Sequence, residues 1–327
     1  MRTDPVDPRP QARAALAVTG ADLAVIGIDF GGTKTEVALA DSTGTPLRRI
    51  RLATRAEHGP DQILARAGAA ARELADHALG ALGLPVAAHA AVSPGVIQPD
   101  RILLTPNLPG WESLALADRL ARELGVDAVA VANDVRAGAL AELRLGALRD
   151  ADPGIYLSLG TGIAAALTVG GRVLSGAHQA AGEIAYLDPG HPAGAPTAVF
   201  ADGHAPLEEL VGGKALGERS AAELGEELTA ERLFTSEDPA ARRIAAQALD
   251  TLATAVANMA VLVDPERIVV GGGMMAAEAA ILPALTARLA RAVPFPPAVR
   301  PAHFTADASL HGAIALALDH LPARTAA

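Results

Sequence analysis

The residues best placed to do chemistry are Asn133 and Asp134, which directly follow an apolar, valine-rich run over residues 126–132. Such a run predicts a buried parallel strand, and polar groups at the carboxyl end of a parallel strand often contact substrates. The Asp134 carboxylate could take a proton from a bound alcohol, while the Asn133 amide offers a donor and an acceptor to neighbouring hydroxyls. The pair could instead only cap the small-residue helix that follows, and the pair alone does not decide between the two roles.

Two glycine-rich turns could bind phosphate. The first lies at residues 29–34 between expected strands 24–28 and 35–40, and the second at residues 160–162 between expected strands 154–159 and 163–169. Because a strand and not a helix follows the first turn, it is neither a P-loop nor a dinucleotide fingerprint. Their backbone N–H groups can still hold phosphate, although ordinary hairpin turns are the alternative. The repetition, about 130 residues apart, predicts duplicated domains that face each other.

The rest of the chain alternates strands and helices. We expect a third strand over 47–53, a buried strand over 87–92, and helices over 60–82 and 114–124. A long loop ends at Trp111, which is either a substrate contact or a packing anchor. After a loop over 176–213 and a helical region over 215–263, a strand over 268–270, a turn over 271–273 and a helix over 276–292 have the order that suits adenosine. A final helix is expected over 309–321.

Composition excludes several classes of protein. The chain has 327 residues, enough for two domains, and 50% of them are apolar but only 2% aromatic. The formal charge of −10 argues against a nucleic-acid or anionic-membrane partner, and the absence of cysteine excludes disulfides and thiolate metal sites. The start has no signal-peptide layout and the apolar stretch over 14–28 is too short to span a membrane. We therefore expect a cytoplasmic protein.

Together these motifs resemble the actin-like ATPase superfamily and, within it, the ROK family of bacterial sugar kinases and sugar-responsive repressors. The resemblance implies an α/β fold with two actin-like (ribonuclease H-like) domains and a cleft between them. We expect a loose leader over 1–21, an N-terminal domain over 22–134 plus 308–322, and a C-terminal domain over 135–307. The matching stretches follow the family order and lie at residues 28–34, 106–111, 133–134, 159–162, 182–184, 207–208, 264–265 and 268–273.

The resemblance also implies an activity, ATP-dependent phosphorylation of a hexose hydroxyl, usually at C6, by a homodimer. Asp134 is then the general base, and the sugar contacts are Gly95, Asn107, Asn133, Asp134, Glu183, Tyr186 and Glu208. Asp29 would hold Mg²⁺ through the ATP phosphates, and the nucleotide would be bound by Gly31, Gly32, Thr33, Lys34, Gly160, Thr161, Gly162, Gly272 and Gly273. Lys34 could equally be a solvated lysine on a strand edge.

One segment departs from the family pattern. Tyr186 stands where the family has a zinc-binding histidine, and Val199, Ala201 and Pro206 stand where it has cysteines, so no structural zinc is expected. A substitute metal site built from Asp188, His191, Asp202 and His204 is conceivable, but surface loops often hold such residues without metal. The C1–C2 side of the sugar should therefore be recognised differently here. Because two carboxylates can hold an ammonium group, the substrate is either glucose or an amino-hexose such as kanosamine.

Two rival functions follow from the same resemblance. A repressor of this family carries an N-terminal winged helix-turn-helix, yet only about twenty residues precede the first strand and the charge is unsuited to DNA. A non-catalytic sugar sensor is the second rival, and the presence of Asp134 argues against it. A chaperone or filament of the wider superfamily is disfavoured by the two sugar-binding glutamates.

Overall fold

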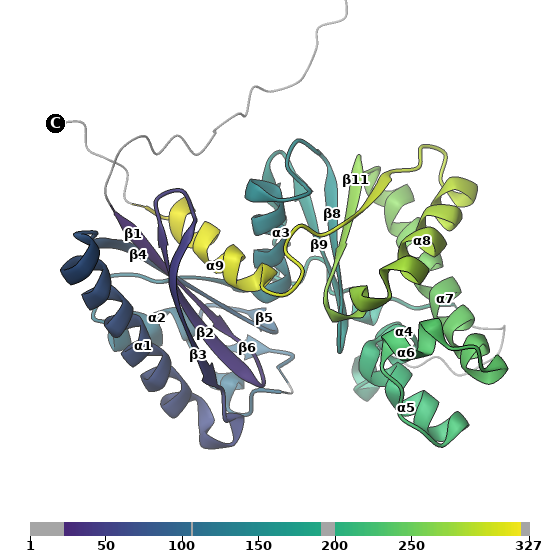
Figure 1. The fold of residues 1–327 in the computed structure, drawn as a ribbon, viewed down its shortest axis with the longest axis horizontal. Coiled ribbons are helices and arrows are strands. Elements are labelled where there is room, and N and C mark those ends of the chain that lie inside the picture. Colours follow the sequence, from purple (N-terminus) through teal and green to yellow (C-terminus); the bar gives the residue numbers. More distant parts are fainter. Residues whose placement is uncertain (1–22, 106, 191–199, 322–327) are drawn as a thin grey trace, which may run out of the picture.

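The computed structural model describes residues 23–105, 107–190 and 200–321, which form two five-stranded sheets with helices on both faces of each (Figure 1). In the first sheet a three-stranded antiparallel meander continues into two parallel strands. Its spatial order is β3 (Pro46–Ala53), β2 (Lys34–Asp41), β1 (Ala24–Phe30), β4 (Val86–Ser93) and β7 (Ala130–Asn133).

The second sheet repeats this arrangement strand for strand. Antiparallel pairing of its first three strands is again followed by two parallel strands. The order is β10 (Arg172–Val173), β9 (Ile163–Val169), β8 (Gly154–Leu159), β11 (Arg267–Gly271) and β12 (Ala298–Pro301). The duplication predicted from the two glycine-rich hairpins is therefore confirmed. One glycine-rich turn joins β1 to β2, and the other joins β8 to β9.

Helices cover the outer faces of both sheets. On the first sheet lie α1 (Gly59–Leu82) and α2 (Leu116–Leu124), and on the second lie α7 (Pro239–Val263) and α8 (Glu278–Ala292). The short helices α4 (Glu208–Val211), α5 (Gly213–Leu224) and α6 (Ala230–Thr235) pack beside α7. The segments 239–263 and 273–292 are long and apolar enough to cross a bilayer by length and composition. However, their apolar faces contribute to the core of the second domain.

Two helices, α3 (Asp134–Leu145) and α9 (Ala308–Asp319), lie between the two sheets (Figure 1). Small residues allow them to approach closely, because a Cβ at Gly312 of α9 would collide with the backbone of Ala137 on α3. A Cβ at Gly27 of β1 would likewise meet the α9 backbone at Ile314, 2.9 Å away. The alanine-rich, aromatic-poor composition therefore builds a thin, tightly packed layer at the centre of the molecule.

The expected element pattern needs several corrections. The run before Asn133 is not a buried strand, because β7 has only four residues, forms one edge of its sheet and is partly exposed. The long loop after β4 contains a small hairpin, β5 (Val96–Ile97) and β6 (Ile102–Leu103). The strands β10 and β12 were not expected. Short 3-10 turns occur at Ala56–His58, Trp111–Ser113, Ile184–Tyr186, Phe200–Asp202 and Gly273–Ala277.

Trp111 is a packing anchor. Its side chain is fully buried, and its ring lies 5.3 Å from that of Phe30, edge to face, beneath the first sheet. Phe30 ends β1 next to the first glycine-rich turn. Trp111 therefore stabilises the start of this turn by packing against Phe30. The expected leader over 1–21 and residue 322 lie outside the described residues, and the domain boundaries stay a prediction.

Candidate active site

Asn133 is the N-cap of α3, and Asp134 is the first residue of the helix. The Asn133 Oδ1 accepts the N–H groups of Val135 (2.9 Å) and Arg136 (3.1 Å), while Nδ2 donates to the Gly95 carbonyl oxygen at 2.9 Å. Capping is thus done by Asn133, and both ends of its amide are engaged. The Asp134 Oδ1 accepts the N–H of Val135 at 2.8 Å, so this N–H is shared between Asn133 and Asp134.

The environment of Asp134 suits a general base. Burial raises the pKa of Asp134 from 3.8 to about 6, partly offset by the Val135 N–H, and the Glu183 carboxylate raises it further while Arg136 lowers it. The residue as a whole is partly buried. A carboxylate with a pKa just below neutral is ionised at pH 7 and still accepts a proton readily.

The charge of Glu183 acts on Asp134, and the charge of Glu208 in turn acts on Glu183. Burial raises the pKa of Glu183, Arg136 lowers it, and the nearby Glu208 raises it. Glu208 is fixed because its Oε2 accepts the N–H of Ile163 at 2.9 Å, and a Cβ at Gly162 would collide with this carboxylate. The second glycine-rich turn therefore positions a predicted sugar-binding residue directly, a contact that the sequence motif did not indicate.

Tyr186 lies beside both glutamates. Burial raises the pKa of its phenol, and the charges of Glu183 and Glu208 raise it further. Its ring packs edge to face against Phe200, with centroids 5.2 Å apart. The predicted residues Asp134, Glu183, Tyr186 and Glu208 are therefore brought together from the two domains.

The two glycine-rich turns are held rigidly by their neighbours. In the first, Gly31 donates its N–H to the Lys34 carbonyl oxygen at 2.9 Å, and Thr54 Oγ1 donates to the Gly31 carbonyl oxygen at 2.6 Å. In the second, the N-terminus of α5 donates to the turn, from Gly213 to Gly160 (2.9 Å) and from Lys214 to Thr161 (3.0 Å). The side chains of Thr33 and Thr161, at the tips of the turns, are exposed.

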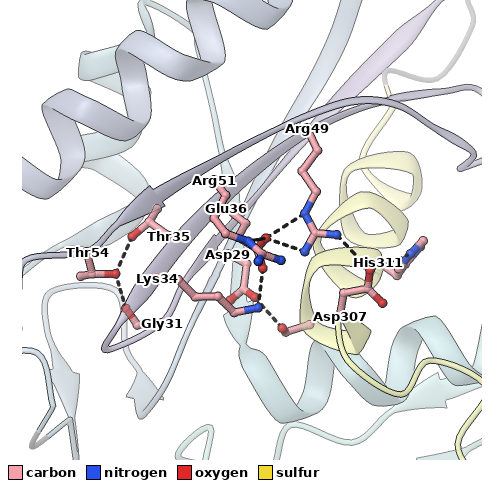
Figure 2. Close-up of polar contacts among 11 residues, drawn as sticks. Asp29, Gly31, Lys34, Thr35, Glu36, Arg49, Arg51, Thr54, Asp307 and His311 are labelled. Carbon is pink, nitrogen blue, oxygen red and sulfur yellow. Dashed lines mark hydrogen bonds and ion pairs between the residues drawn. The ribbon is translucent and has the colours of Figure 1, made fainter.

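Lys34 does not stand free on a strand edge. Its Nζ lies 2.7 Å from Oε2 of Glu36, whose other oxygen pairs with Arg49 and Arg51 on β3 (Figure 2). Burial raises the pKa of Glu36, but the hydrogen bonds from Lys34, Arg51 and Arg49 outweigh it and lower the pKa to about 2. Lys34 remains 44% exposed, so it keeps access to a ligand while Glu36 fixes its position.

Asp29 faces the same region from the end of β1. Its Oδ2 accepts a hydrogen bond from Ser309 of α9 at 2.6 Å. Burial raises the pKa of Asp29 to about 6, the Ser309 hydrogen bond lowers it, and the charges of Asp134 and Glu36 raise it again. Asp29 and Asp134 are therefore neighbouring carboxylates, and the repulsion between them would be relieved by a cation.

Residues 25–320 match the profile of the ROK family. The chain belongs to the ROK family. A kanosamine kinase of Amycolatopsis mediterranei is 29% identical over 303 residues, covering 89% of this chain and 95% of that enzyme. The bifunctional enzyme NanE/NanK of Brucella melitensis is 31% identical over 256 residues, and the match spans only 45% of that longer protein.

Solved ROK structures share the fold. A ROK hexokinase from Thermus thermophilus is 30% identical, with a TM-score of 0.73 over 90% of this chain and 98% of that one. A ROK glucokinase from Streptomyces griseus, solved with glucose and AMPPNP, is 25% identical, with a TM-score of 0.71 over 90% of this chain and 99% of that one. The two-domain actin-like architecture expected from the motifs is confirmed.

In this ROK protein the two glycines predicted to seat adenosine differ. Gly272 has φ 93, and a Cβ there would collide with the carbonyl oxygen of Leu159, so the fold itself requires this glycine. A Cβ at Gly273 would meet nothing within 4 Å, so its surface is open. In the first domain Gly32 packs on Asn107, because a Cβ at Gly32 would lie 3.1 Å from the Asn107 Cβ. Gly273 and Asn107 are exposed, whereas Gly272 and Gly32 are partly buried.

The segment that departs from the family pattern holds no candidate metal cluster among the residues whose side chains are described. His204 Nδ1 lies 3.0 Å from Glu209 Oε1, and both side chains are about half exposed. Of the other residues considered for a substitute site, His191 and the Asp202 side chain lie outside the described residues.

Two residues of the site were not expected from the sequence, Arg136 and Ser309. Arg136 is buried beside Asp134 and Glu183, and Ser309 binds Asp29 across 280 positions of sequence. For Arg136 a signal was present, because a cation in the first turn of a helix opposes the helix dipole and needs acidic neighbours. No local pattern indicated Ser309.

Proposed function

We propose that this ATP-dependent sugar kinase transfers the γ-phosphate to the C6 hydroxyl of glucose or of an amino-hexose such as kanosamine, with Asp134 as the general base. The observation that carries the proposal is the carboxylate of the partly buried Asp134, with a pKa of about 6, grouped with Glu183 and Glu208 from the other domain. A hexose is then the partner of the protein. The homodimer and the cytoplasmic location stay predictions.

The proposed reaction assigns one proton to Asp134. Its carboxylate accepts the hydroxyl proton as the sugar oxygen bonds to the γ-phosphorus, and the bond from that phosphorus to the bridging oxygen of ADP breaks. Glu183 and Glu208 accept hydrogen bonds from other sugar hydroxyls and so hold the reacting oxygen against the base. Asn133 contributes by fixing the start of α3 on Gly95, which keeps Asp134 in place.

The residues present fit Mg²⁺ and a nucleotide. Asp29 offers a hard oxygen ligand whose raised pKa reflects burial and nearby negative charge, which a divalent cation would relieve. When bound, Mg²⁺ neutralises charge on the ATP phosphates. The turns at Gly31–Gly32 and Gly160–Gly162 would hold the phosphates through N–H groups other than those of Gly31 and Gly160, which are hydrogen-bonded within the turns. Lys34 would supply a positive charge, and the open surface at Gly273 would face adenosine.

The choice between glucose and an amino-hexose depends on the Glu183, Glu208 and Tyr186 group. Two neighbouring carboxylates attract an ammonium group, and the similarity to a kanosamine kinase supports a cationic sugar. A neutral hexose would instead use the same carboxylates only as hydrogen-bond acceptors. A non-catalytic sensor is the alternative function, and it would bind sugar without releasing ADP.

A coupled ADP-release assay tests the proposal over glucose, glucosamine, kanosamine and N-acetylmannosamine. We expect sugar-dependent ADP release, with a higher kcat/KM for glucosamine and kanosamine, which carry an ammonium group, than for glucose. Asp134→Asn should slow release by ~100-fold or more while sugar binding, measured by calorimetry, persists. Binding without ADP release by the unmodified protein would favour the sensor. A clear preference for glucose would remove the amino-hexose as substrate.

A further inference from the structure

Arg136 is a buried cation next to the proposed base. It lies in the first turn of α3, two residues after Asp134, and is only 6% exposed. A buried guanidinium is stable only beside acidic groups, and Asp134 and Glu183 are the carboxylates that act on it. Glu183, one of the two glutamates proposed to attract a cationic sugar, thus already has a cation beside it.

A hydrogen bond to a residue 43 positions later in the chain holds Arg136 in position. Its Nη1 donates to the carbonyl oxygen of Gln179 at 2.5 Å, in the loop that leads to Glu183. Gln179 has φ 60, a left-handed conformation that is unfavourable for a residue with a side chain. The loop is fixed at its other end, because Ala165 on β9 donates to the Gly182 carbonyl oxygen at 2.8 Å. The guanidinium is therefore held at a defined place beside Glu183.

We infer that Arg136 is a specificity-determining positioning residue, whose fixed positive charge limits how strongly the Glu183 side of the pocket attracts a cationic sugar relative to a neutral one. Asp134, Glu183 and Glu208 supply three carboxylates, and Arg136 offsets one of them. Without it the group would carry more negative charge and would favour an ammonium group over a hydroxyl more strongly than the unmodified site does. The inference rests on the proposed function only in taking this group as the sugar site.

The test compares three variants by calorimetric binding of glucose and of glucosamine, in the absence of ATP, at pH 6.5. Arg136→Gln removes the charge but keeps an N–H donor for the Gln179 carbonyl oxygen, and Arg136→Lys keeps the charge. The matched control is Arg144→Gln. Arg144 lies on the same helix, and its Nη2 pairs with Oδ2 of Asp319 at 3.0 Å. If Arg136→Gln does not give a cooperative thermal unfolding transition, Arg136→Met takes its place.

In the neutral variant we expect the ratio of glucosamine to glucose affinity to rise at least about fivefold, the effect of removing one nearby unit charge from a partly solvated site. Arg136→Lys and the Arg144→Gln control should keep the unmodified ratio to within about twofold. Loss of folding, or general loosening of the loop over 179–183, would weaken the binding of both sugars and leave the ratio of their affinities unchanged.

An unchanged ratio in the folded neutral variant would overturn the inference, as would an equal rise in Arg136→Lys. Since binding is measured without nucleotide, the result does not depend on phosphoryl transfer. Absence of ADP release by the unmodified protein would instead count against the proposed function, so the two failures are distinguishable.

Discussion

Replacing Asp134 by asparagine should make the protein more stable at neutral pH and less active. Asparagine keeps the oxygen that accepts the Val135 N–H but cannot be ionised. The pKa of Asp134 rises from 3.8 to about 6 on folding, through burial first and then the charge of Glu183. Above pH 6 the folded protein therefore holds this charge at a cost of up to ~3 kcal/mol.

The sign of the effect follows from proton binding. Between about pH 4 and pH 6 the folded state binds the Asp134 proton more tightly than the unfolded state, so the free energy of unfolding falls as the pH rises through this window. Below it the penalty is absent, and above it the penalty is complete. Asp134→Asn removes the penalty, so its advantage over the unmodified protein should be up to ~3 kcal/mol at pH 7.5 and small at pH 4.

Urea unfolding at the two pH values measures the stability difference, and the ADP-release assay measures turnover. We expect kcat to fall by ~100-fold or more, the usual contribution of a general base. Asp118→Asn, an exposed first-turn aspartate of α2, is the control and should give no pH-dependent gain. An Asp134→Asn variant with normal turnover, or with the same stability difference at both pH values, would refute the reasoning.

Three further predictions follow from the structure. The kcat/KM should decline below about pH 6 as the Asp134 carboxylate becomes protonated, and a profile that is flat down to pH 5 would contradict this role. Gly273→Ala should fold normally and raise the KM for ATP, whereas Gly272→Ala should lower the melting temperature because its Cβ collides with Leu159; equal stability of the two would be inconsistent with the packing. Glu36→Gln should lower the free energy of unfolding by ~3 kcal/mol at pH 7, because Lys34, Arg49 and Arg51 lose a buried charged partner. Chemical unfolding measures this, and a loss below ~1 kcal/mol would mean that these ion pairs are solvated.

The local pattern of the sequence was enough to place most elements. The strands β8 and β9 have the bounds predicted from the sequence, and α1 differs by one residue at its start. Hairpins and amphipathic helices are determined by neighbours in sequence, so their periodicity is visible directly. Short edge strands such as β7 and β12 were misjudged or missed, because at an edge the pairing partner and not the apolar pattern decides the strand.

Within the site, the sequence by itself determined which chemical groups are available: Asp134 after a strand, two glycine-rich turns and a pair of glutamates. Only the tertiary structure decided how they act together. It placed Glu183 beside Asp134, assigned the cap to Asn133, and separated Gly272, which packing requires, from Gly273, which is open. These outcomes depend on burial and on contacts between residues far apart in the chain, which set the charge and access of each group and leave no mark in local periodicity.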